Sequence, residues 1–170
     1  LWIGPAATMI QTQRVLKSYD IAQYVMTLSY SALTSPKTGG AMFYQTRTEV
    51  TYGQEQIVYD WRECMLPRLV VFDECQALKN EESTRTAIAR GLPESVKRLF
   101  ISATPYQRVC EARTVMVGVG MRSEYNVLPL SQGTAPSVMR SLATYGNTSA
   151  YSPKAMENVK GVMQPYTVNV

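Results

Sequence analysis

The stretch Leu69–Gln76, LVVFDECQ, decides how the rest of the chain is interpreted. An apolar run rich in β-branched and aromatic residues leads directly into two adjacent carboxylates, Asp73 and Glu74. A short continuous apolar run is typical of a strand buried on both faces, as in a parallel sheet covered by helices. Acids are costly in such a place unless they have a partner. At the C-terminal end of a strand, however, they face the crevice in which α/β sheets bind ligands. The stretch therefore predicts an α/β fold with a ligand site at this edge of the sheet.

The two acids also have the arrangement of a Walker B motif. In that motif one Asp, here Asp73, holds Mg²⁺ on the phosphates of a nucleotide. A neighbouring Glu, here Glu74, accepts a proton from the attacking water. Because apolar runs ending in Asp-Glu are also common at ordinary strand ends, the motif alone leaves both interpretations open.

A second short apolar run, Arg98–Ile101, is followed by Ser-Ala-Thr-Pro at residues 102–105. Between the two runs, Ser83–Arg90 predicts a short helix, which Gly91 closes. A single crossover helix joins parallel strands that lie close together. We therefore expect the acids and the Ser-Ala-Thr stretch to end neighbouring strands.

DECQ followed by SAT at this distance resembles the helicases and translocases of superfamily two. Leu78–Asn80, directly after the acidic box, resembles more narrowly the Swi/Snf-type DNA-dependent ATPases, in which a Lys-Asn pair follows the box. Thr104–Pro105 with Gln107 resembles the TP-x-Q stretch of the same family. Residues 66–108 carry most of the resemblance. It implies that residues 1–170 belong to a helicase ATP-binding lobe of the RecA-like P-loop NTPase fold.

The resemblance also implies ATP and Mg²⁺ as cofactors, duplex DNA contacted through its backbone, and a second RecA-like lobe as partner. Asp73 would hold Mg²⁺ through water, Glu74 would activate the hydrolytic water, and Gln76 would lie at the nucleotide. Ser102, Ala103 and Thr104 would couple this site to the DNA-facing surface. Cys75 is expected to pack in the interior. The implied location is intracellular and nuclear.

Candidate nucleic-acid contacts come from stretches that resemble two further motifs of the family and from the residue after the box. Each has an alternative interpretation. Ala6 and Ala7 follow the expected strand Leu1–Ile3 and begin an expected helix over residues 6–18, so they also suit an ordinary strand-to-helix turn. Ser29 and Tyr30 stand where the family has a Thr-Tyr pair, but a serine there also caps the following helix. Lys79 either meets a phosphate or is solvated.

The composition narrows the class of protein further. Hydrophobic content of 45% and charged content of 18% are those of a globular domain. The net charge of +4 suits either an ordinary surface or an anionic partner. Without histidine, and with three cysteines that form no CxxC pair, the chain has no usual zinc-finger pattern and no catalytic histidine. Scattered cysteines suit a reducing compartment. The sequence contains no signal peptide pattern and no apolar stretch near the ~20 residues that span a bilayer.

No G-x-x-x-x-G-K-[ST] motif occurs in the 170 residues, so the phosphate cradle of a P-loop is missing. The chain opens at Leu1 in a strand-like run. We therefore expect a lobe that is incomplete at its N-terminus and lacks ATPase activity by itself. Two alternatives remain: an RNA helicase of the same superfamily, or a non-catalytic remnant acting as an interaction domain.

The other expected elements are less sharply marked. Strands are predicted at residues 24–30 and 44–50, with Gly53 in a turn, and helices at 57–65, 106–119 and 155–163. The aromatic residues Tyr52, Tyr59 and Trp61 are expected to cover a core edge rather than to stack on bases.

Overall fold

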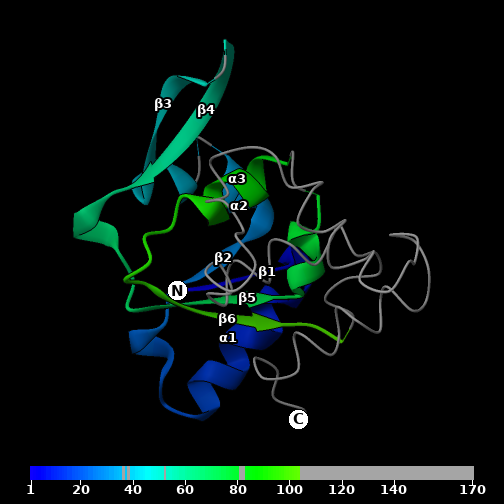
Figure 1. Ribbon diagram of the computed structural model, residues 1–170. Helices are drawn as coiled ribbons and strands as arrows, with labels where there is room; N and C mark the ends of the chain where they lie inside the picture. The colour runs from blue at the N-terminus through cyan, green and yellow to red at the C-terminus, as the bar shows by residue number, and fades with distance from the viewer. Residues whose placement is uncertain (36, 38, 52, 81–82, 104–170) are drawn as a thin grey trace, which may run out of the picture.

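The computed structural model of the protein describes residues 1–103 apart from residues 36, 38, 52, 81 and 82 (Figure 1). The strands of this part are β1 (Trp2–Gly4), β2 (Thr27–Ser29), β3 (Tyr44–Thr51), β4 (Gln54–Trp61), β5 (Leu69–Asp73) and β6 (Lys97–Ile101). Its α-helices are α1 (Met9–Ser18), α2 (Tyr30–Thr34) and α3 (Thr84–Arg90). Its 3₁₀ helices are η1 (Ala6–Thr8), η2 (Ala22–Tyr24), η3 (Gly39–Met42), η4 (Glu63–Met65) and η5 (Cys75–Leu78). Tyr52, Thr104 and the helices expected at 106–119 and 155–163 lie outside the described residues.

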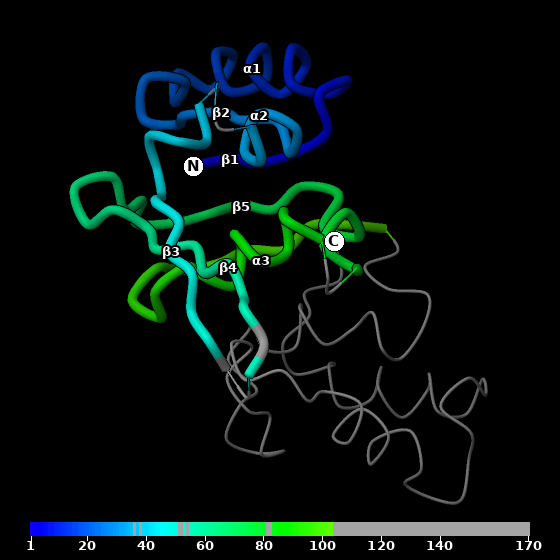
Figure 2. Tube along the Cα trace, turned by 90° about the horizontal axis from the view of Figure 1, so that it is seen from above, coloured from blue at the N-terminus to red at the C-terminus, as the bar shows by residue number. Residues whose placement is uncertain are grey.

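The strand of the acidic box, β5, lies inside a parallel sheet with the order β2-β1-β5-β6. Figure 2 shows β1 and β5 running side by side. On the other side of β5, Phe72 is opposite Phe100 of β6, and the two rings stack with centroids 5.2 Å apart. The α/β fold with a parallel sheet is confirmed. The prediction that the strands before the acids and before the Ser-Ala-Thr stretch are neighbours is also confirmed, because β5 pairs with β6.

Helices cover both faces of the sheet, with α1 on one side and α2 and α3 on the other (Figure 1). The neighbouring residues Val71 and Phe72 point to opposite faces, as successive strand residues do, and both are buried. On the face of α1, Gln13 Nε2 donates a hydrogen bond to Thr27 Oγ1 at 2.8 Å. The main core lies on the other face, and its largest fully buried apolar residues are Ile3, Leu33, Val70, Phe72, Leu78 and Ile88.

Helix α3 connects β5 to β6 and begins where the sequence predicts. Ser83 is its N-cap, and Ser83 Oγ accepts a hydrogen bond from the Thr86 amide at 3.3 Å. Gly91 follows the helix, as expected. A Cβ at this position would overlap the carbonyl oxygen of Tyr59, so glycine is needed for β4 to approach α3 closely.

Strands β3 and β4 form an antiparallel hairpin that projects from the α/β body (Figure 1). The predicted strand at 44–50 and the turn at Gly53, with φ 78°, are confirmed. Two buried side chains anchor the base of the hairpin. Tyr44 donates from its hydroxyl to the Leu33 carbonyl at 2.6 Å, and Trp61 Nε1 donates to the Ile88 carbonyl at 2.9 Å. The hairpin is thus attached to both α2 and α3, and each of these helices contributes to the walls of the site described below.

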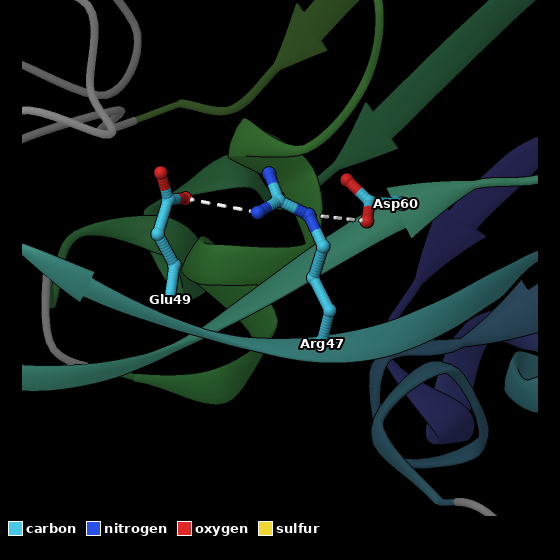
Figure 3. A network of polar contacts seen from close by, with 3 residues as sticks. All are labelled: Arg47, Glu49 and Asp60. Atoms are coloured by element: carbon cyan, nitrogen blue, oxygen red, sulfur yellow. Dashed lines mark hydrogen bonds and ion pairs between the residues drawn. The ribbon is translucent and has the colours of Figure 1, made fainter.

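The hairpin also carries a small ion-pair network (Figure 3). Arg47 lies between two acids: its Nε is 2.8 Å from Asp60 Oδ2, and its Nη1 is 3.2 Å from Glu49 Oε2. All three side chains are well exposed, so each pair contributes less than about 1 kcal/mol to stability. We infer that the buried anchors at the base hold the hairpin in place more strongly than these pairs do.

Three sequence-based boundaries need correction. The helix expected at 57–65 is wrong, because residues up to Trp61 pair with β3 in the hairpin and only η4 follows. The strand expected at 24–30 is shorter, since Tyr24 belongs to η2 and only Thr27–Ser29 pair with β1. The helix expected at 6–18 starts with the 3₁₀ turn η1 before α1. As expected, Trp61 is buried and Tyr59 packs against the core.

Candidate functional site

The chain changes direction sharply within the acidic box. Asp73 is the last residue of β5, and Glu74 adopts a left-handed backbone conformation with φ 52° and ψ 54°. That conformation costs a residue with a side chain roughly 1–2 kcal/mol, and such strain clusters at functional sites. The turn leads directly into η5, whose first two residues are Cys75 and Gln76.

A side-chain bridge joins the acidic box to the Ser-Ala-Thr stretch. Gln76 Nε2 donates to Glu74 Oε2 at 2.7 Å, and Ser102 Oγ donates to Gln76 Oε1 at 2.5 Å. Because β5 and β6 pair in parallel register, their C-terminal ends meet at one edge of the sheet. Residues 26 positions apart in the sequence are thereby in direct contact. Ala103 follows Ser102 and is exposed.

The two carboxylates of the box face different hollows. Asp73 lines a cavity of about 450 Å³ on the side of α1, together with Trp2 and Thr12. Gly4 leaves space for it, since a Cβ at residue 4 would lie only 3.2 Å from the Asp73 Cβ. Glu74, in contrast, lines a cleft on the side of α2 and α3. The left-handed turn at Glu74 therefore separates the two acids, and each carboxylate meets a different set of neighbours.

The cleft has a volume of about 660 Å³ and brings together three of the stretches singled out in the sequence. Its walls come from the turn after β1, from α2, from η5 and from α3. The lining residues are Pro5, Ala6, Tyr30, Ser31, Thr34, Glu74, Gln76, Ala77 and Arg85.

Of the predicted nucleic-acid contacts, Ala6 and Tyr30 line the cleft, whereas Ala7, Ser29 and Lys79 do not. Ala7 is exposed on η1, and Lys79 is exposed at the end of η5. Ser29 caps α2, because its Oγ accepts a hydrogen bond from the Ala32 amide at 3.1 Å. The capping alternative for Ser29 is confirmed.

Tyr30 supports the site from within the fold. The residue is buried, and its hydroxyl donates to the backbone carbonyl of Asp73 at 3.0 Å. Burial, assisted by the negative charges around the box, raises the pKa of the phenol far above its usual value, so it stays protonated. The hydroxyl is therefore always available as a donor, and it ties α2 to the end of β5.

Cys75 lies beneath the box and packs in the core, as expected. Burial raises the pKa of its thiol to about 12, and the charges of Glu74 and Asp73 act in the same direction. A thiol that remains protonated is a poor nucleophile and a poor metal ligand. Its contribution is therefore packing.

Arg85 is the charged residue of the cleft that the sequence analysis did not single out. It lies near the start of α3, two residues after the Ser83 cap, and its side chain is exposed in the cleft. The cap predicts where the helix begins but not which of its faces meets η5 and α2. No sequence signal separates Arg85 from the other cations of the chain.

The donor set suits one mode of magnesium binding. Mg²⁺ in nucleotide-dependent enzymes is held by one or two carboxylates, by waters and by the substrate's phosphates. Asp73, half-buried at a strand end, offers one such carboxylate. Within the described ranges, His, Cys, Asp and Glu side chains form no group of three or more that would bind a metal ion without a substrate. The same part of the chain contains no helix long and apolar enough to cross a membrane.

Comparisons with known proteins leave the family open. No protein-family model matches the chain. No curated protein gives a significant match either. The function is therefore inferred from the residues of the site and their geometry.

Proposed function

We propose that the chain forms part of the first RecA-like lobe of a Swi/Snf-type motor that couples ATP hydrolysis to movement on DNA. The observation that carries this proposal is the bridge from Glu74 through Gln76 to Ser102. It connects the acidic box to the Ser-Ala-Thr stretch at the carboxyl ends of neighbouring parallel strands, where open α/β sheets bind ligands. A motor needs such a connection, because the state of the nucleotide must reach a second surface.

In the proposed reaction, Glu74 is the general base. A water oxygen forms a bond to the γ-phosphorus of ATP, the bond from that phosphorus to the bridging oxygen breaks, and the water's proton passes to the Glu74 carboxylate. The hydrogen bond from Gln76 occupies Oε2 of Glu74 and leaves Oε1 to accept the proton. Asp73 would hold Mg²⁺ through water, and the ion would supply positive charge to neutralise the phosphates.

Coupling follows from the same bridge. A proton or a charge that arrives at Glu74 changes its hydrogen bond with Gln76, and Gln76 in turn holds Ser102. Ser102, Ala103 and Thr104 would pass this change to the surface that contacts the DNA backbone and to the second RecA-like lobe. The proposed DNA contacts are Ala6, Ala7, Tyr30 and Lys79, whereas Ser29, also predicted as a contact, caps α2.

One observation favours a second candidate, a non-catalytic interaction domain. The 170 residues contain no Walker A motif, so no sequence among them supplies the amides and the lysine that cradle phosphates. A domain of this kind would keep the bridge as a structural contact and would neither bind nor hydrolyse ATP.

The deciding experiment uses Glu74→Gln in the full-length protein, with Glu63→Gln as the matched control. Glu63 is an exposed acid of η4, which precedes the N-terminal end of β5. ATP binding should persist in Glu74→Gln while hydrolysis falls by about 10²–10⁴-fold, because the amide keeps the shape but cannot take the proton. Hydrolysis is measured without nucleic acid, with duplex DNA and with RNA. Stronger stimulation by RNA than by DNA would favour the alternative that the protein is an RNA helicase. Unchanged hydrolysis in Glu74→Gln would refute the role of the base. A wild-type protein that binds no ATP would favour the interaction domain.

A further inference from the structure

Glu74 lies between two backbone carbonyl groups, and a hydrogen bond holds each of them. The Tyr30 hydroxyl donates to the carbonyl oxygen of Asp73 at 3.0 Å. The Ala77 amide donates to the carbonyl oxygen of Glu74 at 3.0 Å, within the first turn of η5. The backbone angles of Glu74 describe the rotation between these two carbonyl groups. The two hydrogen bonds together therefore support its left-handed conformation, and one of them comes from a side chain of another helix.

The register of the sheet explains how a residue of α2 reaches the acidic box. Ser29 at the end of β2 pairs with Gly4 of β1, and a Cβ at Gly4 would lie 3.2 Å from the Asp73 Cβ. The carboxyl ends of β2, β1 and β5 are therefore level. Neighbouring strands lie about 4.8 Å apart, so the span from β2 to β5 is about 10 Å. Tyr30, the first residue of α2, is buried and combines a side chain of sufficient length with a donor at its tip.

The hydrogen bond from α2 acts on Glu74 more than on Asp73. A left-handed backbone is disfavoured for a residue with a Cβ, and a right-handed one is the ordinary alternative. Rotation of the backbone at Glu74 would turn its carboxylate away from the cleft that it lines. Asp73 would stay where it is, because it still pairs with Ile101 of β6. The hydroxyl of Tyr30 thus controls the direction of one acid of the box.

We propose that Tyr30 is a positioning residue of the acidic box, whose hydroxyl holds the left-handed turn and thereby directs the Glu74 carboxylate into the cleft. The inference rests on the proposed function, in which Glu74 is the general base, and adds a residue on which the position of that base depends. It also connects α2 to the box independently of the bridge from Gln76 to Ser102. Because the hydroxyl proton is used within the fold, the DNA contact also proposed for Tyr30 would involve another part of the residue.

The first test compares Tyr30→Phe with the matched control Tyr44→Phe in the full-length protein. Each variant keeps a buried ring and loses a hydroxyl that donates to a backbone carbonyl, but the Tyr44 bond goes to Leu33 at the base of the hairpin. Thermal unfolding establishes that both variants are folded at the assay temperature. The kcat and KM for ATP hydrolysis are then measured at saturating Mg²⁺.

The two kinetic constants should respond differently in Tyr30→Phe. A displacement of about 1 Å at the reacting groups costs up to about 10²-fold in rate, so we expect kcat to fall by about 10–10²-fold. KM should change little, since Asp73 keeps its place and the lost positioning matters in the transition state. Tyr44→Phe should leave both constants at their wild-type values.

The second test requires no ATP. With the hydroxyl present, glycine at residue 74 should be favoured over alanine by about fivefold in the equilibrium constant of unfolding, because glycine adopts the left-handed conformation without penalty. If Tyr30→Phe releases the turn, alanine escapes this penalty and the difference shrinks or reverses. Urea titrations of Glu74→Gly and Glu74→Ala, each alone and combined with Tyr30→Phe, measure the change. Combination with Tyr44→Phe should leave the difference intact.

Two results would overturn the proposal: a kcat in Tyr30→Phe no lower than in Tyr44→Phe, or a difference between glycine and alanine that Tyr30→Phe does not alter. Failure here is distinguishable from failure of the proposed function. If Glu74→Gln abolishes hydrolysis while Tyr30→Phe hydrolyses ATP like the wild type, only the role of Tyr30 falls. If Glu74→Gln hydrolyses ATP normally, the proposed function falls, and the urea titrations still decide whether Tyr30 holds the turn.

Discussion

Replacing Glu74 by glycine and by alanine tests the unusual backbone of the acidic box. Glu74 has φ 52° and ψ 54°, a conformation that costs roughly 1–2 kcal/mol for a residue with a Cβ and little for glycine. Both substitutions remove the carboxylate and the hydrogen bond from Gln76, so these losses cancel when the two variants are compared. Glycine also increases the entropy of the unfolded chain, which offsets part of its advantage. We therefore expect Glu74→Gly to be more stable than Glu74→Ala by about 1 kcal/mol.

The free energy of unfolding is measured by urea titration, with the fluorescence of buried Trp61 as the probe. A second comparison of glycine with alanine, at a helical residue of α3, should give a stability difference of the opposite sign. Arg85→Gly should be less stable than Arg85→Ala by up to about 1 kcal/mol, because glycine is disfavoured in a helix and Arg85 lies in the first turn of α3. If glycine and alanine at residue 74 give equal stability, or alanine is the more stable, then Glu74 is not left-handed and the separation of the two acids must be explained differently.

Two further predictions concern coupling and pH. In the full-length protein, Ser102→Ala combined with Thr104→Ala should keep much of the basal ATP hydrolysis and lose stimulation by DNA, because neither hydroxyl contacts the metal or the water in the proposed scheme. Paired ATPase assays with and without DNA measure both activities. Loss of ATP binding in this variant would contradict the prediction. The second prediction uses the thiol of Cys75, whose pKa rises from 9.0 to about 12 on folding. Its contribution to stability is fully present below pH 9.0 and is lost as the pH rises towards 12, since the unfolded thiol ionises first, with a slope of up to about 1.4 kcal/mol per pH unit. Urea titrations of the wild type and Cys75→Ala between about pH 8 and 10 should show a shallower decline in the variant, and parallel declines would refute the assignment.

Local signals in the sequence determined the frame of the fold. The apolar runs before the acids and before Ser102 form β5 and β6, because continuous apolar residues are stable only where both faces of a strand are covered. Ser83 sets the start of α3, since a hydroxyl at that position satisfies a free amide of the first turn. The spacing of these signals was enough to place the acids and Ser102 at one edge of the sheet.

The hairpin shows where local reasoning failed. Residues from Ile57 onward were expected to be helical, yet Ile57, Tyr59 and Trp61 alternate along β4 and pair with β3. A short segment of mixed composition has little preference of its own, so the partner strand decides its conformation. Gly91 is also explained only by the tertiary structure, because its missing side chain makes room for the Tyr59 carbonyl of β4.

Only the tertiary structure decided the details of the candidate site. The order of Glu74, Gln76 and Ser102 can be read from the sequence, but their hydrogen bonds require the left-handed turn at Glu74 and the register of β6 against β5. Arg85 reaches the cleft because α3 packs with one particular face towards η5 and α2. Strand and cap signals act over a few residues, whereas the rotation of a helix and the meeting of distant side chains depend on how the whole core packs. The sequence by itself therefore determined which strands carry the acids, and the packing determined what those acids face.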